Sequence, residues 1–265
     1  STWYIHHGNE RTVSKERDAM KGSYLGPEFS DTEIEAELNA CGAVYEKRSE
    51  NEIIDEVAET LSDEKAVGWM QGRMEFGPRA LGGRSIIADP RSPKMQKQLN
   101  LKVKYRESFR PFAPSILRED VSEWFEHDTD SPYMLLVANV NEDKRLAMTE
   151  EEEALFGIDK LNVPRSSVPA ITHIDNSARI QTVHDDTNPR YHAVISKFKE
   201  KTGCPIVVNT SFNVRGEPII CTPTDAFKCF MGTDLDVLVV GNYLLIKEKQ
   251  NKNLLDNYKE LYELD

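Results

Sequence analysis

Residues 72–114, GRMEFGPRALGGRSIIADPRSPKMQKQLNLKVKYRESFRPFAP, form the most distinctive segment of the chain. It contains ten Lys or Arg residues against three acids, a balance of about +7. The whole 265-residue chain carries −12, so the remaining residues carry −19. A strongly cationic segment in an acidic protein indicates a local task, the binding of anions.

Glycines and prolines interleave with the arginines of this segment. Glycine permits positive φ and close approach of the backbone, and proline fixes φ. We therefore expect bent backbone that directs the arginines inward, where the planar guanidinium suits phosphate and carboxylate oxygens. The alternative is a solvated basic patch that pairs with acids elsewhere. Apolar neighbours such as Phe76 and Phe112 favour the anion site.

Length and composition indicate a globular protein with a buried core. The 265 residues suffice for one large domain or two small ones, with 39% hydrophobic and 29% charged residues. The sequence contains no run of about 18 apolar residues, so no membrane-spanning helix is expected. The acidic balance argues against non-specific binding of nucleic acid.

The chain starts with STWYIHHGNE, which has neither an initiator Met nor a signal-peptide pattern. We therefore expect a piece of a longer cytoplasmic protein. The cysteine spacing fits neither a CxxC motif nor a zinc site, so we predict separate reduced thiols and no metal site in this chain. These residues are Cys41, Cys204, Cys221 and Cys229.

Hydrophobic periodicity predicts helices and strands in irregular alternation. Helices are expected at 31–42, 50–64, 93–103, 121–125, 191–202 and 224–231. Strands are expected at 65–70, 85–88, 112–117, 133–140, 170–174, 178–183, 205–209, 235–240 and 243–246. Thr224 is the expected N-cap of its helix, and Pro114 places its strand at a sheet edge or a bend. Residues 141–165 read as a charged surface insert, and 1–30 as irregular.

Three short motifs contain candidate binding residues. In Lys104-x-Arg106, alternate residues of an extended segment would point the same way, beside Arg110. This KxR pattern is weak by itself, because most such pairs are exposed. The second motif is Asn209-Thr210-Ser211-Phe212-Asn213 with Arg215, which follows a predicted buried strand. Its polar side chains either bind a ligand at the end of the strand or hydrogen-bond to the backbone of their own turn, and the residues leave both alternatives open.

The third motif holds His173 and Arg179. His173 is either a base or nucleotide contact, or a hydrogen-bonded structural histidine. Arg179 lies on an apolar predicted strand, so a buried guanidinium there needs an anionic partner, supplied by a ligand or by an acid of the chain. The sequence lacks a P-loop, a GxGxxG motif, an HExxH motif and a GxSxG elbow, so any phosphate binding must use side chains and irregular backbone.

Five segments together resemble the C-terminal region of the O-carbamoyltransferase family, which includes nodulation-factor and antibiotic carbamoyltransferases. They occur in the family's order, and the resemblance spans about residues 20–248. The segments are GRMEFGPRALGGRSIIADPR, VKYRESFRPFAPSIL, DNSARIQTV, NTSFNVRGEPIICTPTDAF and DVLVVGNYLLIK.

The resemblance implies an α/β (α+β) fold of YrdC-like type, a twisted mixed sheet flanked by helices. It places an N-terminal helical subregion, a linker remnant, at 1–62, a ligand-binding domain at 63–250 and a charged tail at 251–265. In that superfamily a KxR plus SxN set binds the acyl phosphate and the nucleotide. Lys104, Arg106, Ser211 and Asn213 match this set and are the expected catalytic residues.

The resemblance further implies that carbamoyl phosphate and ATP, with Mg²⁺, give carbamoyl adenylate. Arg179 is expected to join the KxR pair on the phosphates, with Ser211 and Asn213 on the carbamoyl or phosphate oxygens. Additional binding candidates are Arg73, Arg79, Arg84, Arg110, His173, Asn209, Thr210 and Arg215.

In this family an N-terminal domain of actin-like ATPase fold moves the carbamoyl group to a substrate hydroxyl. That domain is absent from this sequence, and any iron site belongs to it, since His6 and His7 do not rebuild its His/Asp metal site. The chain alone is therefore expected to perform at most the activation half-reaction. The alternatives are a threonylcarbamoyl-adenylate synthase, an RNA-binding module, and a domain that binds ligand without turnover.

Overall fold

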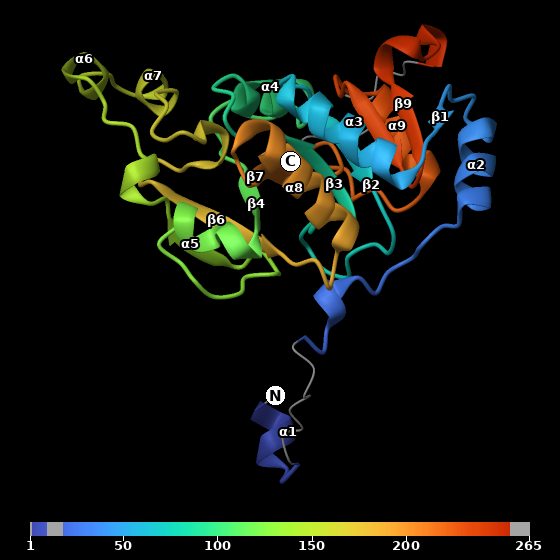
Figure 1. Ribbon diagram of the computed structural model, residues 1–265, viewed down its shortest axis with the longest axis horizontal. Helices are drawn as coiled ribbons and strands as arrows, with labels where there is room; N and C mark the ends of the chain where they lie inside the picture. Colours follow the sequence, from blue (N-terminus) through green and yellow to red (C-terminus); the bar gives the residue numbers. More distant parts are fainter. Residues whose placement is uncertain (1, 10–17, 255–265) are drawn as a thin grey trace.

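The computed structural model describes residues 2–9 and 18–254. Across these residues nine strands form one open mixed sheet in the order β1-β9-β8-β2-β3-β7-β4-β6-β5 (Figure 1). The strands are β1 Glu46–Lys47, β2 Val67–Met70, β3 Arg84–Ala88, β4 Ala113–Leu117, β5 Leu136–Asn139, β6 Ser177–Val183, β7 Ile206–Ser211, β8 Val237–Val240 and β9 Tyr243–Ile246.

Helices flank this sheet, with α3 and α8 side by side in front of it in Figure 1. The helices are α1 Thr2–His6, α2 Asp31–Ala40, α3 Glu50–Ser62, α4 Met95–Lys102, α5 Val121–Trp124, α6 Glu150–Glu153, α7 Ile158–Leu161, α8 Pro189–Thr202 and α9 Pro223–Met231. The predicted α/β class with a mixed, helix-flanked sheet is confirmed. No helix of residues 2–9 and 18–254 is long and apolar enough to cross a membrane.

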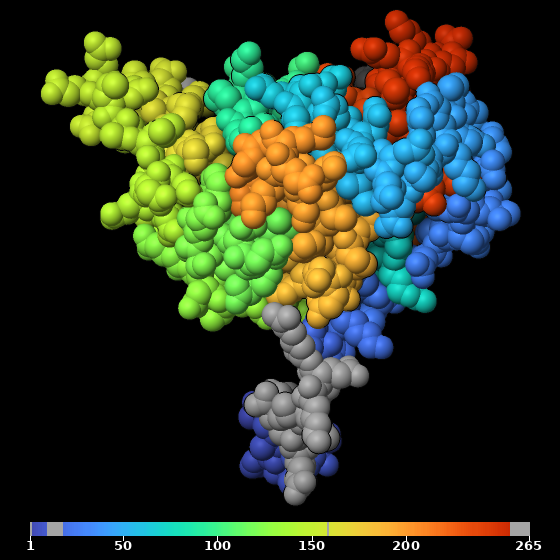
Figure 2. Space-filling view, viewed as in Figure 1, coloured from blue at the N-terminus to red at the C-terminus, as the bar shows by residue number. Residues whose placement is uncertain are grey.

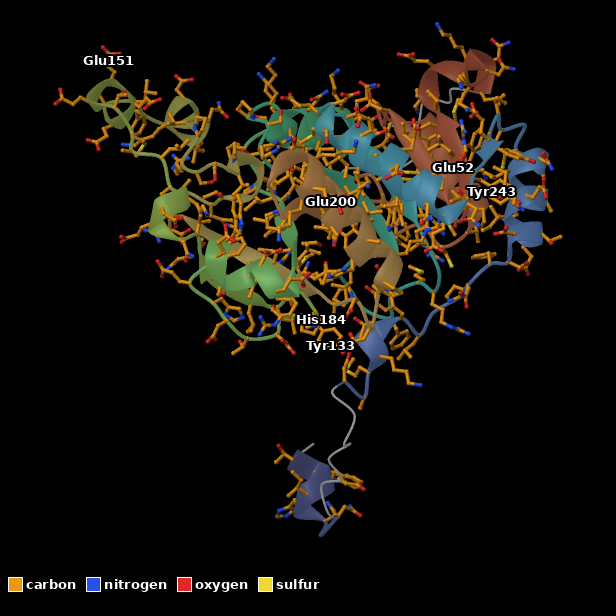
Figure 3. The ribbon with its side chains drawn as sticks, viewed as in Figure 1. Glu52, Tyr133, Glu151, His184, Glu200 and Tyr243 are labelled. Atoms are coloured by element: carbon orange, nitrogen blue, oxygen red, sulfur yellow. The ribbon has the colours of Figure 1, made fainter. Side chains whose placement is uncertain are left out.

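Local sequence explains where the N-terminal helices begin. Ser30 caps α2 and Ser49 caps α3, each in a capping box with a glutamate three residues later. The buried faces of both helices, including Leu38 and Val57, join the same hydrophobic core as the sheet. Helix α3 presents Glu52 at its start in Figure 3.

Most predicted elements are present, but Pro114 is not at a sheet edge. Its strand β4 lies inside the sheet, between β7 and β6. The ladder to β7 includes Pro114 opposite Val208, whereas the ladder to β6 begins only at Ser115. The missing N–H is tolerated because proline precedes the part of the strand that is paired on both sides.

Two further local predictions are wrong. The N-cap of α9 is Thr222, whose side chain accepts a bond from the Asp225 N–H. Thr224 instead donates its hydroxyl proton to Glu37, 2.7 Å between the oxygens, which ties α9 to α2. The expected strand at 170–174 is absent, because Pro169–Ile171 forms a 3-10 turn.

The insert at 141–165 projects from one end of the molecule (Figure 2). It carries α6 and α7, and Glu151 at its tip points away from the protein in Figure 3. All four cysteines are free thiols, as the spacing predicts. The C-terminal tail prediction covers 251–265, of which 255–265 lie outside the described residues.

Candidate anion-binding site at the end of β7

The site begins where the chain leaves α4. The Lys104 N–H donates to Leu99 O and the Arg106 N–H donates to Asn100 O, so the chain wraps around the end of the helix. Tyr105 between them has φ +50° and donates its hydroxyl proton to Gly232 O. The segment therefore turns, and the extended conformation expected for the KxR motif is wrong. The turn brings the Lys104 side chain to the end of β7.

Lys104 is the centre of the site, with only 4% of the residue exposed. Its ammonium nitrogen lies 2.7 Å from Asn213 Oδ1, 2.9 Å from Asn213 O and 3.3 Å from Ser211 Oγ, and it also donates to Ser211 O. These groups are all neutral. Burial therefore lowers the pKa of Lys104 to about 7; nearby Arg106 acts in the same direction, and the Glu217 carboxylate opposes the shift.

The guanidinium of Arg106 lies beside this ammonium. Its Nε donates to Asn100 Oδ1 over 2.6 Å, and its carbon lies 5.0 Å from the centre of the Phe112 ring. Burial, aided by Arg110, lowers its pKa to about 10. Asn100 is fully buried on α4 and fixes the direction of Arg106, a role that the sequence analysis missed. The sequence feature that could have identified Asn100 is a polar residue at a position of the helix that faces the core.

The loop after β7 is fixed by its own hydrogen bonds. Ser211 Oγ lies 2.7 Å from Asn213 Oδ1, and Asn213 Nδ2 donates to Glu217 O. The Glu217 carboxylate accepts the N–H of Val214 over 2.7 Å. The predicted SxN pair is therefore held in one geometry next to Lys104. Glu217, within the same GEP sequence, is a further residue of the site that the sequence analysis did not identify.

A second group of cations lies on the other side of β4. Arg179 on β6 has Nη2 4.0 Å from the sulfur of Met134, and its buried Nε has no hydrogen-bond partner among the described residues. Met134 packs with Ala113, the residue after Phe112. The start of β4 is therefore flanked by Arg106 on one side and Arg179 on the other.

Electrostatic coupling shows which other cations belong to this second group. Burial lowers the pKa of Arg179, and exposed Arg79 adds to the effect. Burial also lowers the pKa of His173, and Arg179 contributes, while Asp175 opposes the shift. Arg179 is thus a partly buried cation beside a second cation, Arg79, and such surroundings favour the binding of an anion.

Other sequence-predicted residues have different surroundings. The fully buried Arg84 donates to the carbonyls of five residues, which occupies its guanidinium. Asn209 donates to Ala80 O, Ser115 Oγ and Gln181 Oε1 within the sheet. These contacts give both side chains a structural part in holding the strands and loops under the site.

The remaining candidates lie at the periphery. Exposed Arg110 and half-buried Arg215 each lie 4.0 Å from the Glu107 carboxylate. Thr210 precedes Ser211 on β7. Arg73 pairs with Glu28, 3.5 Å between Nε and Oε2, and lines a separate cavity. The structure thus brings the KxR and SxN residues together. Arg84 adjoins them through its backbone, since its carbonyl accepts the Phe212 N–H, but its guanidinium is taken up by carbonyls.

The fold and this site define a mixed α/β domain that concentrates buried, poorly compensated cations at the end of a strand. Residues 58–247 match the family described as "Carbamoyltransferase C-terminus". The match covers well over half of the chain, so the protein belongs to this family of carbamoyltransferase C-terminal domains.

Relatives support the same assignment. The chain is 58% identical to an uncharacterized protein, sll1178, of Synechocystis sp., covering 100% of this chain and 43% of that protein. It is 43% identical to nodulation protein NolNO of Sinorhizobium fredii, with coverages of 90% and 33%. It is 35% identical to the 3'-hydroxymethylcephem-O-carbamoyltransferase of Amycolatopsis lactamdurans, over 71% of this chain and 32% of that protein. The chain thus spans less than half the length of these relatives.

Proposed function

We propose that this chain binds carbamoyl phosphate and Mg²⁺·ATP and forms carbamoyl adenylate. Transfer of the carbamoyl group to a hydroxyl acceptor then requires an N-terminal domain of actin-like ATPase fold, in line with the greater length of the relatives. The carbamoyltransferase named among those relatives supports this class of reaction.

One observation carries the proposal: the buried ammonium of Lys104 donates its hydrogen bonds to neutral oxygens of Ser211 and Asn213, and its pKa is lowered even though the Glu217 carboxylate opposes the shift. A buried cation needs an anion or loses its proton. Carbamoyl phosphate or the α-phosphate of ATP would supply that anion. Arg106 would then offer its remaining N–H groups to a second oxygen of the same phosphate.

The chemistry has two balanced steps. Water first takes the phosphoryl group from carbamoyl phosphate, which releases inorganic phosphate and carbamate. A carbamate oxygen then attacks the α-phosphorus of ATP, so that a C–O–P bond forms, the bond to the β-phosphate oxygen breaks, and pyrophosphate leaves. Lys104 and Arg106 would stabilise the charge that develops on the phosphoryl oxygens, and Ser211 and Asn213 would orient the carbamoyl group.

The protein's share in holding Mg²⁺ is small in this proposal. Residues 2–9 and 18–254 contain no group of three or more His, Cys, Asp or Glu side chains suited to a metal ion. Mg²⁺ commonly keeps several waters and takes its other ligands from substrate phosphates. Mg²⁺ would in this proposal arrive with ATP.

Calorimetric titration of the 265-residue chain tests the proposal. Carbamoyl phosphate and a non-hydrolysable ATP analogue with Mg²⁺ should each bind, and Lys104→Ala should weaken both by at least tenfold. Lys102→Ala is the matched control, since this exposed lysine lies two residues away and pairs with exposed Asp234. Binding that survives in Lys104→Ala, or pyrophosphate release that does not depend on carbamoyl phosphate, would overturn the proposed role.

A further inference from the structure

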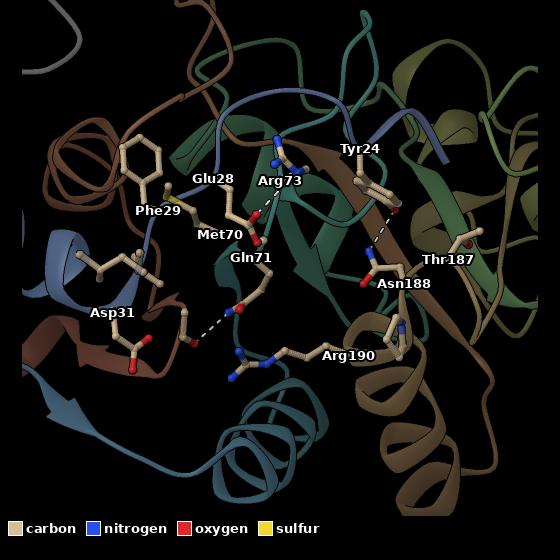
Figure 4. A pocket seen from close by; sticks show the side chains of 15 residues that line it. Tyr24, Glu28, Phe29, Asp31, Met70, Gln71, Arg73, Thr187, Asn188 and Arg190 are labelled. Carbon is tan, nitrogen blue, oxygen red and sulfur yellow. Dashed lines mark hydrogen bonds and ion pairs between the residues drawn. The ribbon is translucent and has the colours of Figure 1, made fainter. Parts of the chain in front are cut away.

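A cavity of about 460 Å³ has none of the KxR and SxN residues in its wall (Figure 4). It opens where the neighbouring parallel strands β2 and β8 end, at Met70 and Val240. The start of α8 forms another wall, with Asn188 as the N-cap. The carboxyl ends of parallel strands and the N-terminus of a helix are both places where α/β proteins bind ligands.

Arg190, the second residue of α8, reaches into this cavity in Figure 4. Its Nη2 donates to the neutral amide oxygen of Asn242 over 2.8 Å. Its Nε is buried and has no hydrogen-bond partner among residues 2–9 and 18–254. Burial lowers the pKa of this guanidinium. Arg190 is therefore a desolvated cation with donor capacity left over.

The acids of the cavity wall do not neutralise it. Glu28 pairs with Arg73, and the Asp31 carboxylate lies 3.1 Å from the ammonium of Lys47. No salt bridge joins Arg190 to an acid within the described part of the chain. Glu50 and Asp31 act on the charge of Arg190 from a distance and oppose the lowering of its pKa, but neither contacts the guanidinium.

The cavity wall is mixed. Polar residues such as Gln71 and Asn188 line part of it, and Phe29, Ile34, Met70 and Val240 form an apolar part. A cavity that combines this apolar part with a guanidinium that no acid contacts favours a ligand with an apolar body and one anionic group. Its volume exceeds that of a two-carbon acid and leaves room for a branched or aromatic side group.

We propose that this cavity binds a small organic monocarboxylate with an apolar body, held at its carboxylate by Arg190. The carboxylate would accept the terminal N–H groups of the Arg190 guanidinium that the bond to Asn242 leaves over, in the forked geometry that arginine offers. Phe29 and Ile34 would contact the apolar body. This site is independent of the proposed carbamoyl chemistry.

Ligand-observed NMR and calorimetry with matched pairs of compounds test the site. Isovalerate and phenylacetate are the acids, and isovaleramide and phenylacetamide are their uncharged counterparts. The acids should bind saturably, at least tenfold more tightly than the amides, and phenylacetate should exceed acetate. Arg190→Gln should weaken the acids at least tenfold. Lys197→Gln, on the exposed side of the same helix and paired with Asp55, should leave binding unchanged.

A second variant keeps the test decisive if Arg190→Gln does not fold. Phe29→Ala should remove the preference for phenylacetate over acetate while it leaves the preference for acids over amides. The proposal is overturned if no acid binds at about 10 mM, if the amides bind as well as the acids, or if folded Arg190→Gln binds unchanged. In each of those cases Arg190 only supports the β8–β9 turn through Asn242.

Discussion

The side chains of Lys104 and Asn213 meet across 109 positions of sequence, with 2.7 Å between Nζ and Oδ1. This bond joins the turn after α4 to the loop after β7, so the KxR and SxN motifs form one site before any ligand arrives. The ammonium has neutral partners, which makes the protonation state of Lys104 the first property to test.

The stability of the free chain should depend on pH through Lys104. Its pKa in the folded state, about 7, lies below the ordinary lysine value of 10.5. Between these values the unfolded chain binds a proton that the folded chain has lost, so the free energy of unfolding rises with pH, by at most about 1.4 kcal/mol per unit. Urea unfolding at pH 7, 8 and 9 should show a shallower rise for Lys104→Met than for Lys102→Met. Equal slopes would exclude Lys104 as the source.

Anion binding should return the proton to Lys104. At pH 8 the free ammonium is largely deprotonated, and a bound phosphate group favours the charged form. Calorimetry with carbamoyl phosphate in HEPES and in Tris, whose ionisation enthalpies differ, should reveal uptake of up to about one proton. The uptake should fall towards zero at pH 6 and should be absent at every pH in Lys104→Ala. Identical enthalpies in both buffers at pH 8 would contradict this expectation.

Asn213→Asp should disable the site. The new carboxylate would lie at the position of Oδ1, within hydrogen-bond distance of the Lys104 ammonium, and would raise the pKa of Lys104. A ligand phosphate would then meet a negative charge. We expect at least tenfold weaker binding of carbamoyl phosphate. Ser211→Ala, which removes a hydroxyl without adding charge, is the comparison, and a variant that binds normally would exclude Asn213 from the ligand site.

Gly82 should resist substitution because the chain turns tightly beneath Tyr191. Its φ is +105°, and an added Cβ would overlap the buried Tyr191 ring. Gly82→Ala should therefore lower the free energy of unfolding by more than about 2 kcal/mol, from backbone strain and overpacking. Gly72→Ala is the control with positive φ, +51°, and open space around the new Cβ, so it should cost about 1 kcal/mol. Similar losses for both would show that contact with Tyr191 is unimportant.

The sequence predicts elements where local rules dominate. Gly203 ends α8 with φ +75°, and Gly241-Asn242 joins β8 to β9, as turn and cap preferences require. Prediction from the sequence fails where the pairing of distant strands decides the structure. Pro114 is an example, because β4 can hold a proline inside the sheet only where its ladder to β6 has not yet begun. The meeting of Lys104 with Asn213 is not encoded in any window of the sequence, and only the family resemblance anticipated it.

The same limitation applies to the arginines, whose roles depend on the backbone around them. Composition could not distinguish Arg84, surrounded by carbonyls, from Arg179, which retains an unsatisfied buried Nε. The cavity of Arg190 likewise combines the ends of β2 and β8 with the starts of α2 and α8, which lie far apart in the chain.

Arg84→Lys separates a structural arginine from a ligand-binding one. The Arg84 guanidinium donates to carbonyls of Gln71, Gly72 and other residues, which fastens the loop before β3. A lysine has fewer donors and a different geometry, so several buried carbonyls would lose their partners, at about 1–3 kcal/mol each. We expect a loss of about 3 kcal/mol or more in the free energy of unfolding, measured by urea titration. Exposed Arg79→Lys should change stability by less than about 0.5 kcal/mol. If Arg84→Lys retains full stability but loses carbamoyl phosphate, the guanidinium acts on the ligand rather than on the fold.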